Sequence, residues 1–184
     1  MRPGQDLVVG GFIGIEGTVY AAEQFETYLR KTLPKNLLET ARGFREALWK
    51  KPGKVAAELN GISVEEVRTG GIFAALWRMA EQYGVGLSVE LRQIPIRQET
   101  IEICEALELN PYELLSGGCL LFAADNGNDV LRAVKEAGLF GAVIGKVTDG
   151  RERLILNGET CSYLNRPVPD EIEKLKERTD RDES

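Results

Sequence analysis

The sequence predicts a mixed α/β (α+β) fold, in which a mixed β-sheet is layered with helices. Short apolar runs bounded by glycine, which are typical of strands, alternate along most of the chain with segments whose apolar residues recur every three or four positions, which is typical of helices. The chain has 184 residues, 43% of them hydrophobic, which is enough for one good core. We therefore expect a single domain, or one domain with appendages.

The first third of the chain is predicted to begin with a strand and to continue with two helices. Residues 6–11 form a short apolar run that ends in glycines, as a buried strand does. Apolar residues then recur at helical spacing over residues 17–29 and again over 37–48. Pro34 and Pro52 end these two segments.

The middle of the chain contains the most regular helical pattern. It follows a mixed stretch that is compatible with a helix over residues 55–59 and a short strand over 61–64. Apolar residues between 72 and 83 then share one helical face, and Gly84 is the expected stop. Residues 85–91 alternate apolar with polar or small residues, which predicts a half-buried strand.

Two helical segments and a fully buried strand are predicted next. A helix is expected over residues 97–107, with Ile101 and Cys104 turned inward, followed by a short helical turn over 110–115. Residues 119–124 are apolar without interruption, which predicts a strand covered on both faces. A further helix follows this strand.

The last part of the chain is predicted to add a hairpin and a tail. The apolar runs 142–147 and 153–156 flank an Asp-Gly turn, which predicts that they pair as a hairpin. Residues 161–164 are expected to add an edge strand. Residues 170–184 are mostly charged, which predicts a marginal helix that frays into a disordered tail.

The composition excludes several kinds of partner and site. The net charge of −6 and pI near 5.0 favour a soluble cytoplasmic protein and argue against nucleic acid as the main partner. No apolar run approaches the ~20 residues of a membrane span. Histidine is absent, which excludes Ser-His and Cys-His nucleophiles and His-ligated zinc. We interpret Cys104, Cys119 and Cys161 as reduced thiols.

Positive charge is concentrated in one stretch. Residues 30–54 contain eight basic and two acidic residues, which leaves a strong negative excess in the rest of the chain. This stretch is either a solvated helix face or a patch for an anion or a partner. Arg97 and Lys146, outside it, are basic residues that either meet phosphate or are simply solvated.

Three glycine loops lead from a strand or turn into the next element. They lie at residues 11–17, 68–71 and 116–118. Glycine lets a backbone approach a ligand closely, and exposed amides at a helix start favour phosphate, but tight turns and helix caps use glycine as well. The candidate ligand and phosphate-binding residues are Gly11, Gly14, Glu16, Gly17, Thr18, Thr69, Gly70, Gly71, Ser116, Gly117 and Gly118.

The carboxylates near these loops are candidates for magnesium binding. Glu16, Glu65 and Glu66 are each compatible with holding a magnesium-nucleotide complex, and equally with the preference of helix starts for acidic residues. Thr18 and Thr69 are alternatively helix N-caps. No catalytic residue is identified.

Six stretches resemble the C-terminal domain of AIR (aminoimidazole ribonucleotide) synthase-related proteins. They are RPGQDLVVGG (2–11), GIEGT (14–18), GGIFAALWRMAEQYGVGL (70–87), IPIRQETIEICE (94–105), NPYELLSGG (110–118) and VIGKV (143–147). The resemblance runs in order from residue 2 to 165. It divides the chain into this domain, residues 1–165, and a charged C-terminal helix or tail, residues 166–184.

The resemblance implies a fold and an activity. The superfamily includes AIR synthetase, formylglycinamidine ribonucleotide amidotransferase, selenophosphate synthetase, thiamine monophosphate kinase and a hydrogenase maturation carbamoyl dehydratase. Its members resemble one another in having an N-terminal half that supplies most ATP and magnesium ligands, and a C-terminal α/β half that closes the cleft. The shared chemistry is ATP-driven activation of an amide or carboxyl oxygen, or a related phosphoryl transfer.

The sequence departs from this family pattern in three ways. The N-terminal ATP-binding half is expected to be missing, because the first strand begins within six residues of Met1. Relatives usually carry a His-Asp pair where Glu65 and Glu66 stand here, so that only Glu66 is implied as a metal ligand. The terminal cysteine motif of the hydrogenase maturation branch is absent from the end of this sequence, which excludes carbamoyl-cysteine chemistry for this polypeptide.

Three hypotheses follow. The first is a catalytically incomplete domain that binds a phosphate-bearing nucleotide or ribonucleotide-like ligand and joins a separately encoded ATP-binding half, which would bring ATP and Mg²⁺. The second is an assembly or regulatory module that has lost ligand binding. The third, a complete small enzyme, would depend on unassisted glutamates. We further expect a homo-oligomer, since isolated domains tend to bury apolar area by self-association.

Overall fold

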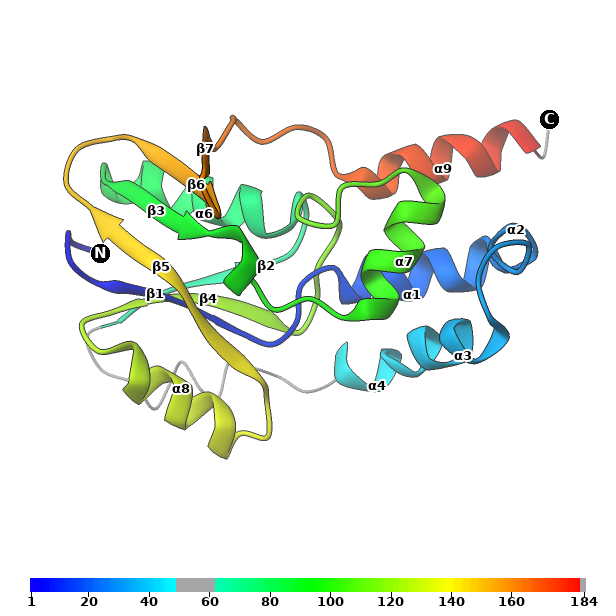
Figure 1. Cartoon of the computed structure of the whole chain (residues 1–184), viewed down its shortest axis with the longest axis horizontal. Coiled ribbons are helices and arrows are strands. Elements are labelled where there is room, and N and C mark those ends of the chain that lie inside the picture. Colours follow the sequence, from blue (N-terminus) through cyan, green and yellow to red (C-terminus); the bar gives the residue numbers. More distant parts are fainter. Residues whose placement is uncertain (49–61, 183–184) are drawn as a thin grey trace.

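The structure is a computed structural model that describes residues 1–48 and 62–182 (Figure 1). The strands are β1 (Asp6–Gly10), β2 (Ser63–Val67), β3 (Gly86–Glu90), β4 (Cys119–Ala124), β5 (Gly141–Thr148), β6 (Arg153–Asn157) and β7 (Thr160–Tyr163). The helices are α1 (Ile15–Gln24), α2 (Glu26–Leu29), α3 (Lys35–Gly43), α4 (Arg45–Leu48), α6 (Gly71–Tyr83), α7 (Gln98–Leu107), α8 (Gly127–Glu136) and α9 (Glu171–Asp182), with a 3₁₀ turn at Leu91–Gln93. The mixed α/β prediction is confirmed.

The described strands form one mixed sheet in the order β2-β4-β1-β5-β3-β6-β7. Neighbouring strands are antiparallel except β3 and β6, which are parallel. Strand β4 is buried along its whole length, as its uninterrupted apolar run predicts. The helix expected over 55–59 lies outside the described residues.

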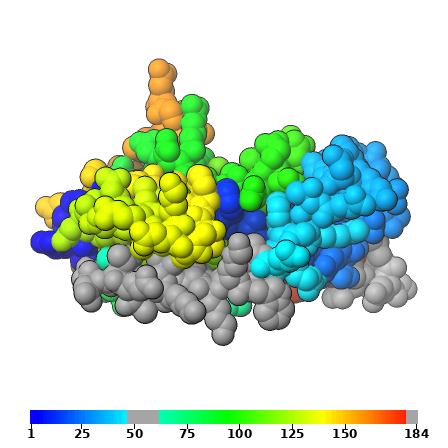
Figure 2. All heavy atoms as spheres, turned by 90° about the horizontal axis from the view of Figure 1, so that it is seen from below, coloured from blue at the N-terminus to red at the C-terminus, as the bar shows by residue number. Residues whose placement is uncertain are grey.

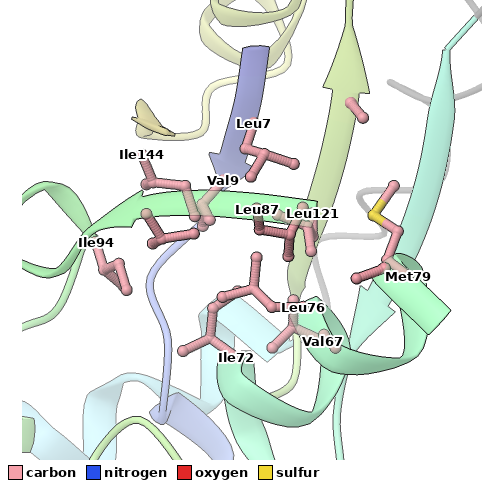
Figure 3. Close-up of a cluster of buried hydrophobic side chains, with 14 of the residues drawn as sticks. Leu7, Val9, Val67, Ile72, Leu76, Met79, Leu87, Ile94, Leu121 and Ile144 are labelled. Atoms are coloured by element: carbon pink, nitrogen blue, oxygen red, sulfur yellow. The ribbon is translucent and has the colours of Figure 1, made fainter. Parts of the chain in front are cut away.

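Helices cover the two faces of the sheet because side chains alternate along each strand. Leu7 and Val9 of β1 face α6, while Val8 between them faces α8. Figure 3 shows the first of these layers, in which Ile72, Leu76 and other residues of α6 pack against the sheet. The strong helical period of α6, with Gly84 in the left-handed conformation as its C-cap, explains why this helix was predictable.

A second, helical layer lies beyond one end of the sheet. Helices α1, α3, α7 and α9 gather there around their own apolar cluster (Figure 1). Helix α9 is held more firmly than its charged composition predicts, because Ile172 and Leu175 are buried in this cluster. In α7 the inward residues include Ile103 and Cys104, whereas Ile101 is exposed, contrary to the sequence-based prediction.

The predicted closing hairpin is wrong. Strand β3 lies between β5 and β6, so the two runs flanking Asp149 and Gly150 do not pair with each other. Glycine at position 145 of β5 allows β3 to pack this closely beside it. A Cβ at Gly145 would stand 2.1 Å from the Ser88 carbonyl oxygen of β3, which is too close for any side chain. The true hairpin joins β6 to β7 at Gly158, whose φ of 64° suits a tight turn. Residues 110–115, expected to be helical, form turns and bends.

Candidate functional site

The first and third glycine loops are packed against each other. The Gly14 N–H donates to the Ser116 hydroxyl at 2.7 Å, and the Gly17 N–H donates to the Leu115 carbonyl at 2.9 Å. Gly11 has a φ of 100°, and a Cβ there would lie 2.7 Å from the Gly118 carbonyl oxygen. Close backbone approach is therefore used to join two parts of this chain.

Helix α1 begins at this junction without a side-chain cap. Gly14 is its N-cap residue, in the left-handed conformation. Thr18 is not a cap: it lies inside the helix, is fully buried, and donates from its hydroxyl to the Gly14 carbonyl at 2.7 Å. The same hydroxyl lies 2.9 Å from that of Thr100 in α7. Thr18 thus ties α1 to α7, which is a structural role.

The second glycine loop meets the third through backbone contacts. Gly71 has a φ of 62°, and a Cβ on it would stand 2.4 Å from the Tyr112 carbonyl oxygen. Its N–H donates to the Arg68 carbonyl at 3.0 Å, and that carbonyl also accepts from the Ser116 N–H at 3.2 Å. The loops are therefore neighbours, as the sequence-based hypothesis requires.

The amide at the start of α6 is occupied by a carboxylate of the same chain. Asp170 is buried and accepts hydrogen bonds from the N–H groups of Gly70 at 2.6 Å, Leu115 at 3.0 Å and Ile172 at 2.9 Å. A helix N-terminus favours negative charge, which explains why a buried carboxylate is stable here. It occupies the position where the sequence predicts an external anion.

Within the described residues, the first and third loops line one pocket and the second loop lines another. The first pocket, of about 500 Å³, is lined by Gly11, Phe12, Ile15, Phe44, Arg97, Gly117, Gly118, Gly138, Leu139 and Phe140. The second, of about 400 Å³, takes in Gly70 and is walled by Phe73, Tyr112 and the segment after β7. Gly14, Gly17 and Thr18 are buried between elements. Of the predicted binding residues, Gly11, Gly117 and Gly118 therefore share one pocket.

The first pocket combines aromatic rings with a positive charge. Phe12 and Phe140 are stacked, with ring centres 5.0 Å apart. The Arg97 guanidinium lies 4.2 Å from the centre of the Phe12 ring and 5.6 Å from that of Phe44. Within the described residues no carboxylate pairs with Arg97, so its charge is free to meet an anion. Figure 2 shows this side of the molecule hollowed between β5 (yellow) and α3 with α4 (cyan).

The candidate carboxylates stand apart from this pocket. Glu65 pairs with Arg78 at 2.7 Å and Glu66 with Arg68 at 3.2 Å, both on β2. Glu16 is half-buried in the first turn of α1, and Thr69 is exposed. In the part of the chain that the structure describes, no three residues of the metal-binding types gather in one place. Metal binding by Glu66 stays a prediction.

Several basic residues outside the pocket are paired with acids. Arg42 and Arg45, in the basic stretch, form ion pairs with Glu26 and Glu23, so this part of the stretch packs α3 and α4 against α1 and α2. Lys146 donates to Asp6 at 2.8 Å. That bond, together with one from the Gly127 N–H, holds the pKa of Asp6 below its ordinary value.

Sequence reasoning missed the aromatic side chains of the pocket and the role of Asp170. Phe12 stands inside a glycine loop, where a large apolar residue is a usable signal for a binding surface. Asp170 precedes Glu171 and Glu173 at the start of a charged helix, which is the signature of an N-cap. That signature does not reveal that the same carboxylate reaches Gly70.

The comparisons with known proteins identify the family. Residues 2–157 match the family described as AIR synthase related protein, C-terminal domain. The chain belongs to this family. It is 27% identical over 121 residues to carbamoyl dehydratase HypE of Rhodobacter capsulatus, covering 66% of this chain and 34% of that protein. It is also 27% identical over 168 residues to the phosphoribosylformylglycinamidine synthase subunit PurL of Caldanaerobacter subterraneus subsp. tengcongensis. This match covers 86% of this chain and 22% of that protein.

Solved structures agree on the fold. The E. coli HypE hydrogenase maturation protein matches with a TM-score of 0.71 at 17% identity, over 92% of this chain and 52% of that one. T. maritima PurL complexed with AMPPCP matches with a TM-score of 0.54 at 21% identity, over 92% of this chain and 27% of the PurL chain. The chain thus spans about half of the HypE structure and a smaller part of the curated relatives. None of its described helices is long and apolar enough to cross a membrane.

Proposed function

We propose that this AIR synthase-related domain binds a phosphate-bearing nucleotide or ribonucleotide-like ligand in its first pocket. The observation that carries the proposal is Arg97, a cation without a carboxylate partner among the described residues, in the lining of a pocket that also contains glycines. In this arrangement Arg97 would meet the phosphate, as arginine commonly does. Phe12 and Phe140 would pack against a planar ring, and Gly117 and Gly118 would leave room for close approach.

We further propose that ATP and Mg²⁺ enter through an ATP-binding half on a separate chain. This rests on the family and on relatives whose structures contain nucleotides: HypE in complex with ATP and PurL with AMPPCP. HypE also forms a complex with HypF, so association is a feature of a relative. Catalysis of the ATP-dependent ligase or phosphoryl-transfer type would require that assembly, with Glu66 as a metal ligand in it. Because free nucleotides are cytoplasmic, we place this function in the cytoplasm.

Titration calorimetry tests ligand binding directly. Aminoimidazole ribonucleotide, a nucleoside monophosphate and ATP-Mg²⁺ would each be titrated into the purified chain. We expect binding of at least one phosphate-bearing compound, weakened about tenfold or more in Arg97→Gln, because a charge-assisted contact is lost. Arg132→Gln, which removes an exposed arginine on α8, is the matched control and should leave affinity unchanged. No heat from any compound would reject the proposal.

The second candidate is a non-catalytic assembly or regulatory module. A specific observation favours it: the amides of Gly14, Gly70 and Gly71 already have partners within the chain, so these three N–H groups are not available to a phosphate. This candidate predicts no nucleotide binding together with stable self-association. The calorimetry described above therefore discriminates between the two functions.

A further inference from the structure

Strand β7 forms one end of the described sheet. It pairs with β6 on one side, and over residues 1–48 and 62–182 no strand pairs with its other side. All four of its residues are exposed, and the exposed fraction of Tyr163 reaches 65%. A strand in this position presents a row of N–H and C=O groups to any strand that approaches it.

The hydrogen bonds to β6 identify which backbone groups point outward. The Leu164 N–H donates to the Arg153 carbonyl at 2.7 Å, so Leu164 directs its backbone groups toward β6. Because this direction alternates along an antiparallel strand, Ser162 also faces β6, while Cys161 and Tyr163 direct N–H and C=O away from it. Two donors and two acceptors therefore stand along the edge.

Apart from its shortness, the strand lacks the usual devices that protect such an edge. Thr160–Tyr163 contains no charged residue and no proline, and its register with β6 has no bulge. The prolines of this region, Pro167 and Pro169, come only after the strand has ended. Nothing within β7 therefore opposes pairing with another strand.

We propose that β7 pairs in antiparallel orientation with β7 of a second copy of this chain, about a two-fold axis through Ser162. In this register Cys161 of one copy lies opposite Tyr163 of the other on both sides of the axis. All outward-pointing groups of the two strands then bond to each other, which completes both edges in one closed, symmetric dimer. The dimer does not depend on ligand binding in the first pocket.

The charges at the two ends of β7 favour a second copy of this chain as the partner, and favour antiparallel over parallel pairing. Glu159 precedes β7 and Arg166 follows it, and both are exposed. Antiparallel pairing brings the Glu159 end of each copy to the Arg166 end of the other, so opposite charges meet twice. Parallel pairing would bring like charges together at both ends.

An uncovered apolar face adjoins the same edge. Tyr163 lies opposite Leu154 and Cys161 opposite Leu156, so these four side chains share the face that points away from α6. Among the described helices, α8 packs on this side of the sheet at β1, β4 and β5, while the side chains of β7 stay exposed. Pairing places the equivalent apolar side chains of the two copies next to each other and reduces their exposure.

The short strand sets the expected strength of association. Stable dimers commonly bury about 800 Å² on each partner, which is more than two four-residue strands provide on their own. The dimer should therefore be concentration-dependent, with a dissociation constant on the order of tens of micromolar.

Sedimentation velocity from about 1 to 300 µM tests the proposal. We expect a monomer at the low end and a dimer at the high end. Tyr163→Lys, which places a charge on the edge, should weaken dimerisation about tenfold or more. Tyr28→Lys replaces another exposed tyrosine, on α2 far from β7 in the sequence, and should leave dimerisation unchanged. A monomer at every concentration, or a dimer that tolerates Tyr163→Lys, would overturn the proposal.

Amide hydrogen exchange by NMR provides a second readout that does not depend on the folding of a variant. The amides of Cys161 and Tyr163 should exchange quickly at low concentration and slowly at high concentration. The Ser162 amide, which is bonded to β6 in both states, should be protected throughout. Equal behaviour of the three amides, or outward amides that stay fast at high concentration, would contradict pairing through β7.

Discussion

The Asp170 carboxylate accepts a hydrogen bond from the Gly70 N–H at 2.6 Å, so the segment before α9 closes the start of α6. The same carboxylate bonds to Leu115 and Ile172, which joins α6, the third glycine loop and α9 at one buried point. The Asp170 carboxylate therefore accepts the hydrogen bond from the Gly70 N–H that the sequence-based hypothesis assigned to a bound phosphate.

Asp170→Asn should lower the free energy of unfolding by roughly 2–3 kcal/mol. The amide can present one oxygen to Leu115 and Ile172, but its NH₂ group then faces the Gly70 N–H, and a buried donor loses its partner. Urea unfolding followed by circular dichroism would measure the loss. Asp149→Asn, at an exposed turn, is the control, and equal stability of the two variants would contradict the role given to Asp170.

Gly17→Ala should destabilise the protein by about 1–3 kcal/mol although it raises helix propensity. A Cβ at Gly17 would lie 2.5 Å from Leu114 Cγ, so α1 and the side chain of Leu114 would have to move apart. Gly43→Ala is the matched control, because nothing lies within 4 Å of a Cβ there and the residue ends α3. Gly43→Ala should be neutral or slightly stabilising in thermal unfolding. If Gly17→Ala and Gly43→Ala changed the unfolding temperature equally little, close packing at Gly17 would be contradicted.

Asp6 should make stability depend on pH in the acid range. Its hydrogen bonds from Lys146 and Gly127 lower the pKa of the folded-state carboxyl below the unfolded value of about 3.9. The folded state thus favours the charged form, and this stabilisation is present above that value and is lost as the pH falls through the folded pKa. Asp6→Asn should cost about 1 kcal/mol at pH 7, a modest amount because Lys146 is largely exposed.

The effect of Asp6→Asn on stability should itself depend on pH, and this dependence serves as the control. Urea midpoints of Asp6→Asn and the unchanged chain should differ at pH 7 and converge toward pH 3. A difference that stays constant over this range would mean that the charge of Asp6 contributes nothing.

Local sequence patterns predicted the positions of individual helices and strands. Glycines and apolar runs placed β1 and β4, and helical spacing followed by Gly84 placed α6 almost to the residue. These signals succeed because strand alternation and helix capping depend on residues within one or two turns.

Long-range arrangements were not predictable in the same way. The hairpin around Asp149 failed because β3, more than fifty residues earlier in the chain, takes the position between the two runs. The hypothesis of one glycine-lined anion pocket did not anticipate Asp170, which reaches Gly70 across 100 residues of sequence and accepts a hydrogen bond from its N–H. Hydrogen-bond partners of this kind depend on the tertiary fold, which one sequence does not display.

The three cysteines should differ sharply in reactivity. Burial raises the thiol pKa of Cys119 to about 12, and burial followed by the nearby negative charge of Glu171 does the same for Cys104. Both therefore stay protonated near pH 8, where only thiolates react, whereas Cys161 is exposed on β7. A disulfide reagent should modify one thiol per chain rapidly in the native protein and three in denaturant. Cys161→Ser should abolish the rapid phase, and a second fast thiol in native protein would show that one of the buried clusters opens.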